Sequence, residues 1–189
     1  METIVTPEFR LSFPAVFKAR SFEGGKEKFS IKMLFDKEQL RKNPEFRKDF
    51  DKLKAYVAAF LAAEFPDDKD ECKPVFNDGD KKSWAGYAGC IYCGASSMSA
   101  PWVVDQFQNK IISETYPEGL YAGCYARAVL HCFAYNVAGN KGVALGLDGI
   151  QKLRDGEPFT GRVRPEDVLT PLDGVEAPPP AADVDDLLL

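Results

Sequence analysis

Two segments near the start of the chain have the pattern of β-strands. Residues 9–20 are rich in aromatic and branched side chains, and residues 27–35 alternate between apolar and polar positions. A pair of glycines between the two segments predicts a turn. The alternation places four apolar residues on one face: Phe29, Ile31, Met33 and Phe35. The other face carries Lys28 and Lys32, so we expect one face to be core and the other to be basic.

A helix is predicted next, over residues 44–65. Asn43 is a good N-cap, Pro44 suits the first helical position, and Pro66 ends the pattern. The apolar positions fall on one stripe: Phe46, Phe50, Leu53, Val57, Phe60 and Leu61. A shorter helical turn is expected over residues 37–41.

Acidic residues, lysines and turn formers dominate residues 67–82, which predicts a long irregular loop. The composition then favours strands again at residues 89–97 and 102–112, with a turn at 108–109 in the second of these. A loop as long as the one predicted over residues 67–82 is often functional in a compact domain.

The longest strand candidate covers residues 120–137 and has two different faces. Its even positions from 122 to 134 are small and apolar, whereas its odd positions are mostly bulky. Gly139-Asn140-Lys141-Gly142 then predicts a hairpin turn into a return strand over residues 143–153. Several strands with one helix in the middle are compatible with a small barrel. We therefore predict a mainly β protein: an OB-fold-like five-stranded barrel over residues 1–162, with the helix inserted among its strands.

The charge of the chain is unevenly distributed. Residues 163–189 contain one basic and seven acidic residues, a net charge of −6, whereas the whole chain carries −5. The first 162 residues therefore sum to +1. A near-neutral, locally basic body with an acidic tail suits a protein whose body binds a polyanion. We expect the tail to be disordered.

Enzyme chemistry finds little support in the sequence. His131 is the only histidine, lies in a strand pattern, and has no serine or carboxylate motif beside it, so a structural role is favoured. Cys90 and Cys93 form a CxxC, but no second tight cysteine pair completes a zinc site. The acidic residues of the 67–82 loop are mixed with lysines, which favours a solvated loop over a metal-dependent nuclease site. We predict that the protein is not an enzyme and has no cofactor.

Membrane and secretion signals are also missing from the pattern. No apolar run is long enough to span a bilayer, and the first residues do not form a signal peptide. Five cysteines are an odd number, which favours free thiols in a reducing compartment.

Binding of single-stranded nucleic acid requires lysines or arginines for the phosphates and exposed aromatic rings for the bases. The candidates with these properties are Lys28, Lys32, Lys81, Lys82, Trp84, Tyr92, Trp102, Tyr121, Tyr125, Arg127, Tyr135 and Lys141. Core packing is the alternative for each aromatic residue, and for Phe29 and Phe133 it is the preferred one.

Residues 121–135, YAGCYARAVLHCFAY, continue into NVAGNKGVALGL and, from residue 149, GIQKLRDGE. This run resembles the C-terminal half of a phage-encoded family of single-stranded DNA-binding proteins, formerly known only as a domain of unknown function. By the order of elements the resemblance extends over about residues 5–160. It implies an OB-fold and a protein that coats single strands during phage DNA replication, recombination or repair, without metal or cofactor, in the cytoplasm of an infected bacterial host.

The resemblance also implies a role for the acidic tail, which in such proteins competes with DNA and docks replication proteins. Here the tail ends in Leu187-Leu188-Leu189 and not in the usual phenylalanine, which puts a pocket for an aromatic end in doubt. The expected partners are single-stranded DNA, duplex DNA, phage or host replication proteins, and a second copy of the chain in a homodimer. The alternatives are an interaction or virion-assembly protein and a zinc-dependent nucleic-acid enzyme.

Overall fold

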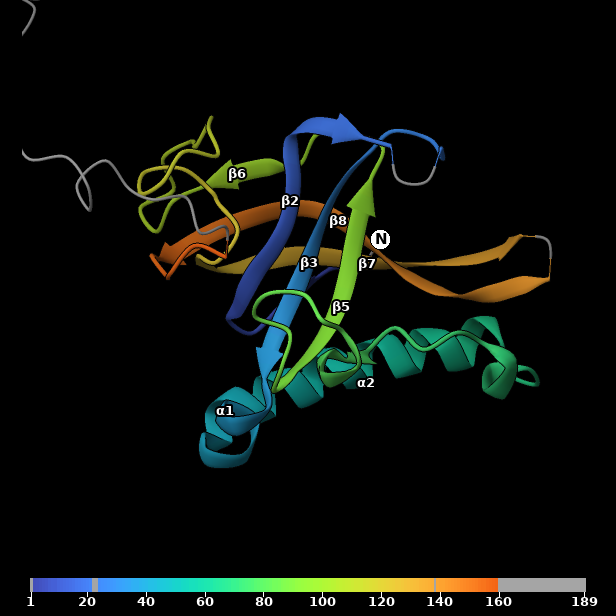
Figure 1. The fold of residues 1–189 in the computed structure, drawn as a ribbon. Helices are drawn as coiled ribbons and strands as arrows, with labels where there is room; N and C mark the ends of the chain where they lie inside the picture. The colour runs from blue at the N-terminus through green and yellow to red at the C-terminus, as the bar shows by residue number, and fades with distance from the viewer. Residues whose placement is uncertain (1, 22–23, 138, 160–189) are drawn as a thin grey trace, which may run out of the picture.

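The computed structural model describes residues 2–21, 24–137 and 139–159, and its fold is mainly β (Figure 1). The strands are β1 (Ile4–Val5), β2 (Phe9–Arg20), β3 (Lys28–Asp36), β4 (Asn77–Asp78), β5 (Cys90–Ser97), β6 (Trp102–Val104), β7 (Tyr125–Val137) and β8 (Asn140–Arg154). The helices are α1 (Lys37–Lys42), α2 (Pro44–Glu64) and two short 3-10 turns, η1 (Lys69–Glu71) and η2 (Gly79–Lys81).

Five of the strands form a closed ring in the order β2-β3-β5-β8-β7. The ring closes because β7 pairs both with β8 and with β2. All neighbours in the ring are antiparallel except β5 and β8, which run parallel. A five-stranded ring of this kind is the OB-fold architecture, so the prediction of an OB-fold-like barrel is confirmed.

The interior of the ring holds the predicted apolar face of β3. Ile31, Met33 and Phe35 are almost completely buried, and Met33 lies opposite Leu11 of β2. The small even residues of β7 face the same core, which includes Ala126, Ala128, Leu130 and Cys132. Burial of these apolar side chains is the main force that holds the ring closed.

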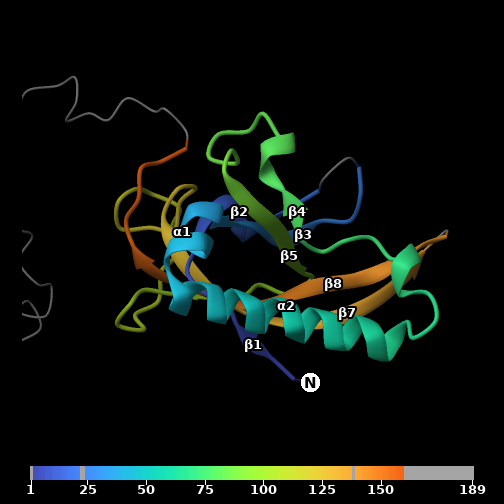
Figure 2. The same cartoon turned by 90° about the horizontal axis from the view of Figure 1, so that it is seen from below.

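The predicted helices are present, and both are capped as their sequences suggest. The Asn43 side chain accepts hydrogen bonds from the backbone N–H groups of Glu45 and Phe46, so α2 begins at Pro44. Three residues of the predicted stripe are buried in the core: Phe50, Leu53 and Val57. Figure 2 shows α2 lying across β7 and β8 at one end of the ring. None of the described helices is both long and apolar enough to cross a membrane.

Two predicted strands are shorter than their patterns indicate. β6 ends at Val104 because the Asp105 carboxylate accepts hydrogen bonds from the N–H groups of Phe107 and Asn109, which turns the chain back. β7 begins only at Tyr125, since Gly123 has a positive φ of 109° and donates its N–H to the carbonyl of Leu11. The predicted loop over 67–82 is largely irregular but includes η1, β4 and η2.

Candidate nucleic-acid interface

The outer face of the ring carries Lys32 at the point where β3 lies between β2 and β5. Lys32 is paired with Ser12 of β2 and with Gly94 of β5. A Cβ at Gly94 would stand 2.7 Å from Lys32 Nζ, so the lysine side chain lies over the glycine. Lys28, four residues earlier on the same strand, is exposed to solvent. Two lysines and a glycine thus occupy this part of the outer face.

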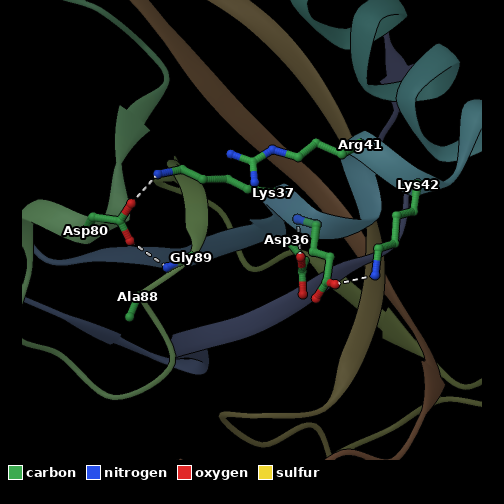
Figure 3. Close-up of a pocket in the computed structure, with 8 residues that line it drawn as sticks. Asp36, Lys37, Arg41, Lys42, Asp80, Ala88 and Gly89 are labelled. Atoms are coloured by element: carbon green, nitrogen blue, oxygen red, sulfur yellow. Dashed lines mark hydrogen bonds and ion pairs between the residues drawn. The ribbon is translucent and has the colours of Figure 1, made fainter.

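Residues 82–89, which we call the 82–89 loop, border this face and are held by ion pairs. Lys37 Nζ lies 2.5 Å from Asp78 Oδ1 and 2.5 Å from Asp80 Oδ2. The other oxygen of Asp80 accepts the N–H of Gly89 at 2.6 Å, as Figure 3 shows. Hydrogen bonds from Lys37 lower the pKa of both aspartates, and the bonds to Asp78 and Asp80 raise the pKa of Lys37. The start of α1 thus fixes both ends of the loop.

Four aromatic rings meet where the 82–89 loop reaches the sheet, and we call them the aromatic cluster: Phe13, Trp84, Tyr87 and Tyr92. Tyr87 is its buried centre, with the rings of Trp84 and Tyr92 each 5.1 Å away in edge-to-face contact. Phe13 lies 5.4 Å from Trp84, and Lys82 Nζ lies 4.8 Å from the Trp84 ring. Phe13 is 56% exposed and Trp84 41% exposed. The cluster therefore presents two rings to solvent on a rigid base.

Six of the predicted residues lie on this side of the β-barrel, on β3, β5, η2 or the 82–89 loop: Lys28, Lys32, Lys81, Lys82, Trp84 and Tyr92. OB-fold proteins bind oligonucleotides across the second and third strands of the ring, which here are β3 and β5. Lysines beside exposed aromatic rings can neutralise phosphates and stack on bases. This combination makes the face a candidate nucleic-acid interface.

Three other predicted residues lie on the β6–β7–β8 part of the sheet and do not join the aromatic cluster. The Trp102 ring covers Gly149, where a Cβ would stand 2.0 Å from it. Tyr135 packs in the same way over Gly142. Arg127 donates from Nε to the Gln151 side chain at 2.8 Å. Each thus has a packing partner, and a role in DNA binding stays a prediction for all three.

Tyr121 and Tyr125 are engaged within the protein, and their assignment as stacking residues stays a prediction. Tyr121 is only 6% exposed, its hydroxyl bonds to Asp155 and Gly156, and burial raises its pKa. The guanidinium carbon of Arg154 lies 3.4 Å from the centre of the Tyr125 ring and covers one of its faces. Both rings are therefore parts of the structure that ties the end of β8 to the barrel.

Lys141 also forms ion pairs within the protein. Its Nζ lies 2.8 Å from Asp68 and 2.7 Å from Glu71, which joins the β7–β8 hairpin to η1. These two carboxylates raise the pKa of Lys141 to about 12. Its charge is paired within the protein, and DNA binding by Lys141 stays a prediction.

His131 and the cysteines take structural positions. His131 Nδ1 lies 2.9 Å from Asp148, and its ring packs over Gly146. Cys93 is completely buried, which raises the pKa of its thiol to about 12, whereas Cys90 lies on the other face of β5. In the part of the chain that the structure describes, no three histidine, cysteine or acidic residues are grouped closely enough to hold a metal ion.

The sequence analysis missed two members of the aromatic cluster, the buried Tyr87 and Phe13, and Phe13 is the exposed one. It was counted only as part of an aromatic strand, where alternation with Phe9 and Leu11 would place it in the core. The available signal is Pro14, because proline inside a strand pattern marks an edge or a bulge. The pairing of β2 with β3 is indeed irregular between Ser12 and Ala15.

Known proteins resemble this chain in sequence and in fold. The chain is 31% identical to protein p50 of Acyrthosiphon pisum secondary endosymbiont phage 1 over an alignment of 166 residues, which covers 80% of this chain and 83% of that protein. The single-stranded DNA-binding protein from bacteriophage Enc34, solved in complex with ssDNA, superposes with a TM-score of 0.62 at 22% identity, over 84% of this chain and 89% of that one.

A second fold relative is gp2.5, a single-stranded DNA-binding protein encoded by bacteriophage T7. It superposes with a TM-score of 0.52 at 14% identity, over 87% of this chain and 98% of that one. The family model described as "Enterobacter phage Enc34, ssDNA-binding protein" matches residues 2–177 of this chain. The chain belongs to the Enc34 single-stranded DNA-binding protein family.

Proposed function

We propose that this protein binds single-stranded DNA through the outer face of β3 and β5 together with the aromatic cluster. The observation that carries the proposal is the pair of exposed rings, Phe13 and Trp84, with Lys82 over the Trp84 ring. Lys32 lies on β3 opposite Ser12, the chain neighbour of Phe13 in β2. Membership of the Enc34 family supports it. The protein would act as a binding protein, with no reaction to catalyse and no metal or cofactor.

Two interactions would hold the single-stranded DNA. Lysines neutralise its phosphates and release counterions, which makes the affinity depend on salt. The exposed rings stack on unpaired bases, and because every base has a π-face the preference for sequence is weak. Duplex DNA offers its phosphates to the same lysines but keeps its bases stacked on each other. We therefore expect duplex DNA to bind more weakly than single strands.

Residues 163–189, the acidic tail of the sequence analysis, lie outside the described residues. The last described residue is Phe159, whose ring fills the space over Gly86 in the 82–89 loop. The last described residue thus lies beside the proposed site, and we propose that the tail, with its net charge of −6, competes with DNA there. Docking of phage or host replication proteins, and action in phage DNA replication, recombination or repair in the cytoplasm of an infected bacterium, belong to the same proposal. The predicted homodimer remains a prediction.

Fluorescence anisotropy of full-length protein on labelled oligo-dT, titrated at several salt concentrations, tests the site. The logarithm of the binding constant should fall linearly with the logarithm of salt, by about 0.7 for each phosphate contacted. Trp84→Ala should weaken binding by about 5-fold to 150-fold, the loss of one stacked base. Trp102→Ala is the matched control, because Trp102 is similarly exposed but lies on β6. Equal losses for the two tryptophans would place the site elsewhere.

A truncation after Arg162 tests the tail. Removal of the competing negative charge should tighten binding to both single-stranded and duplex DNA, most strongly at low salt. If neither the full chain nor the truncated one binds oligo-dT at low salt, the proposed function is wrong. Large assemblies that form without DNA would then favour the virion-assembly alternative.

A further inference from the structure

Phe13 has a backbone conformation that aromatic residues rarely adopt. Its φ is +45°, in the left-handed region, and the only other non-glycine residue with positive φ in the described ranges is Gln108, which lies in the turn after β6. A β-carbon clashes with the backbone in this region, so the conformation costs free energy for any residue other than glycine, and least for asparagine and aspartate. Such strain persists only where the surrounding structure imposes it, and it concentrates at functional sites.

The strained residue changes the direction in which β2 points its side chains. Phe9 and Leu11 face the core, and strict alternation would turn residue 13 inward after them. The irregular pairing between Ser12 and Ala15 shifts this phase, and Val16 is the next member of β2 to join the core. The bulge therefore brings the Phe13 ring outside the barrel, where it packs against the other rings of the aromatic cluster.

Burial does not explain why the ring is there. Phe13 stays 56% exposed, and its close neighbour on the surface, Trp84, is itself 41% exposed. A phenylalanine packed in the core would remove far more apolar area from water without a left-handed backbone. The conformation thus holds an aromatic ring in water at some expense of stability, which is the arrangement expected of a pre-organised binding group.

The geometry of the two exposed rings suits one flat ligand. Their planes meet at 78° with centroids 5.4 Å apart, which forms a corner. A planar group stacked on Phe13 would meet the Trp84 ring edge-on, a favourable arrangement for aromatic groups. Lys82 adds a positive charge 4.8 Å from the centre of the Trp84 ring.

We propose that the corner between Phe13 and Trp84 binds one unpaired nucleobase, and that the bulge in β2 exists to hold the Phe13 ring ready for it. This inference rests on the proposed function, because it assigns one step of single-strand binding to one residue. The corner requires a free base face, so it discriminates single strands from duplexes. Phe13 contributes no charge, so it contributes nothing to the salt dependence of binding.

Phe13→Asn in the full-length chain tests the inference, because asparagine removes the ring but tolerates the left-handed backbone. On oligo-dT its affinity should fall by about 5-fold to 150-fold with an unchanged salt slope. On an oligonucleotide of the same length made of abasic sites, wild type and Phe13→Asn should bind equally. The melting temperature of the variant should equal or exceed that of wild type, because the strain is relieved.

Three further variants complete the design. Phe13→Gly suits the same backbone and should reproduce the loss, whereas Phe13→Trp keeps a stacking surface and should bind oligo-dT within about threefold of wild type. Phe107→Asn is the matched control, because Phe107 is 74% exposed in the turn after β6 and outside the cluster. It should bind oligo-dT as wild type does.

The outcomes separate this inference from the proposed function. If wild type binds oligo-dT and Trp84→Ala does so weakly, but Phe13→Asn and Phe13→Gly match wild type, the assignment of Phe13 is wrong and the site stands. An equal loss for Phe13→Asn on the abasic strand would also overturn it, since the ring would then act without a base. If wild type binds no single-stranded DNA at all, the proposed function itself fails.

Discussion

The guanidinium carbon of Arg10 lies 4.4 Å from the centre of the Phe159 ring. The same ring fills the space over Gly86, where a Cβ would stand 2.3 Å from it. The contact joins three distant parts of the chain: the start of β2, the 82–89 loop and the segment after β8. Arg10 also donates to the carbonyl of Glu157 at 2.7 Å, which fixes this segment further. The end of the described chain is therefore attached to the loop that carries Trp84.

Gly86→Ala should displace Phe159 and loosen the 82–89 loop. Gly89→Ala is a matched control, because Gly89 has a similar positive φ, 73° against 80°, but no atom within 4 Å of its Cβ position. Both changes put alanine in a left-handed conformation, which costs about 1 to 2 kcal/mol of folding free energy. Gly86→Ala should cost more than that in urea denaturation, and the difference reports the Phe159 contact. Equal losses would show that the contact contributes nothing.

The ion pairs of Lys37 should make the 82–89 loop resistant to acid. Asp78 and Asp80 have pKa values below their usual 3.8, so the stability they contribute is fully present above that value and is lost as the pH falls through their lowered values. Lys37 has a raised pKa, so its contribution is present below its usual 10.5 and disappears as the pH rises through the raised value. Trp84 fluorescence, followed in a Trp102→Phe background, should stay constant between these limits.

Lys37→Met should remove that resistance and weaken binding to oligo-dT at neutral pH, since the loop that carries Trp84 loses its anchor. Lys42→Met is the control: Lys42 lines the same depression in Figure 3 but is paired with Glu38 of α1 itself. If Lys37→Met leaves both the fluorescence and the affinity unchanged, the loop is held by its aromatic contacts alone.

Lys32 and Lys141 should differ in their effect on the salt dependence of binding. Lys32→Gln removes a charge from the open outer face of β3, so the salt slope on oligo-dT should fall by about 0.7. Lys141→Gln removes a charge already paired with Asp68 and Glu71, so the slope should not change. A fall in slope for Lys141→Gln would support the prediction that this lysine contacts DNA.

Tyr121→Phe should lower stability without affecting DNA binding. The substitution removes the hydroxyl that donates to Asp155 and accepts the N–H of Gly156. Loss of these buried hydrogen bonds should cost about 1 to 3 kcal/mol in urea denaturation. Tyr135→Phe is the control, because Tyr135 lies on the β7–β8 hairpin and is not fully buried. A weaker affinity for oligo-dT in fully folded Tyr121→Phe would instead support the prediction that Tyr121 contacts DNA.

The sequence predicted local features where short-range chemistry controls them. Asn43 and Pro44 define the start of α2 because capping involves only the first turn of the helix. Alternation predicted the buried face of β3 because side chains in a strand point to opposite sides. The bulge at Phe13 was missed because it depends on how β2 pairs with β3, although Pro14 signals an irregularity.

By itself the sequence determined the identity of most strands, the helix and its caps, the basic face of β3 and the uneven charge of the chain. Only the tertiary structure decided which of the aromatic and basic residues stand free. Tyr121 and Lys141 look like DNA-binding residues along the chain, but partners far away in sequence take up the hydroxyl of one and the charge of the other. Closure of the ring also brought Phe13 of β2 against Trp84 of the 82–89 loop. Contacts of this kind depend on strand pairing and burial across the whole domain, which no local pattern of residues encodes.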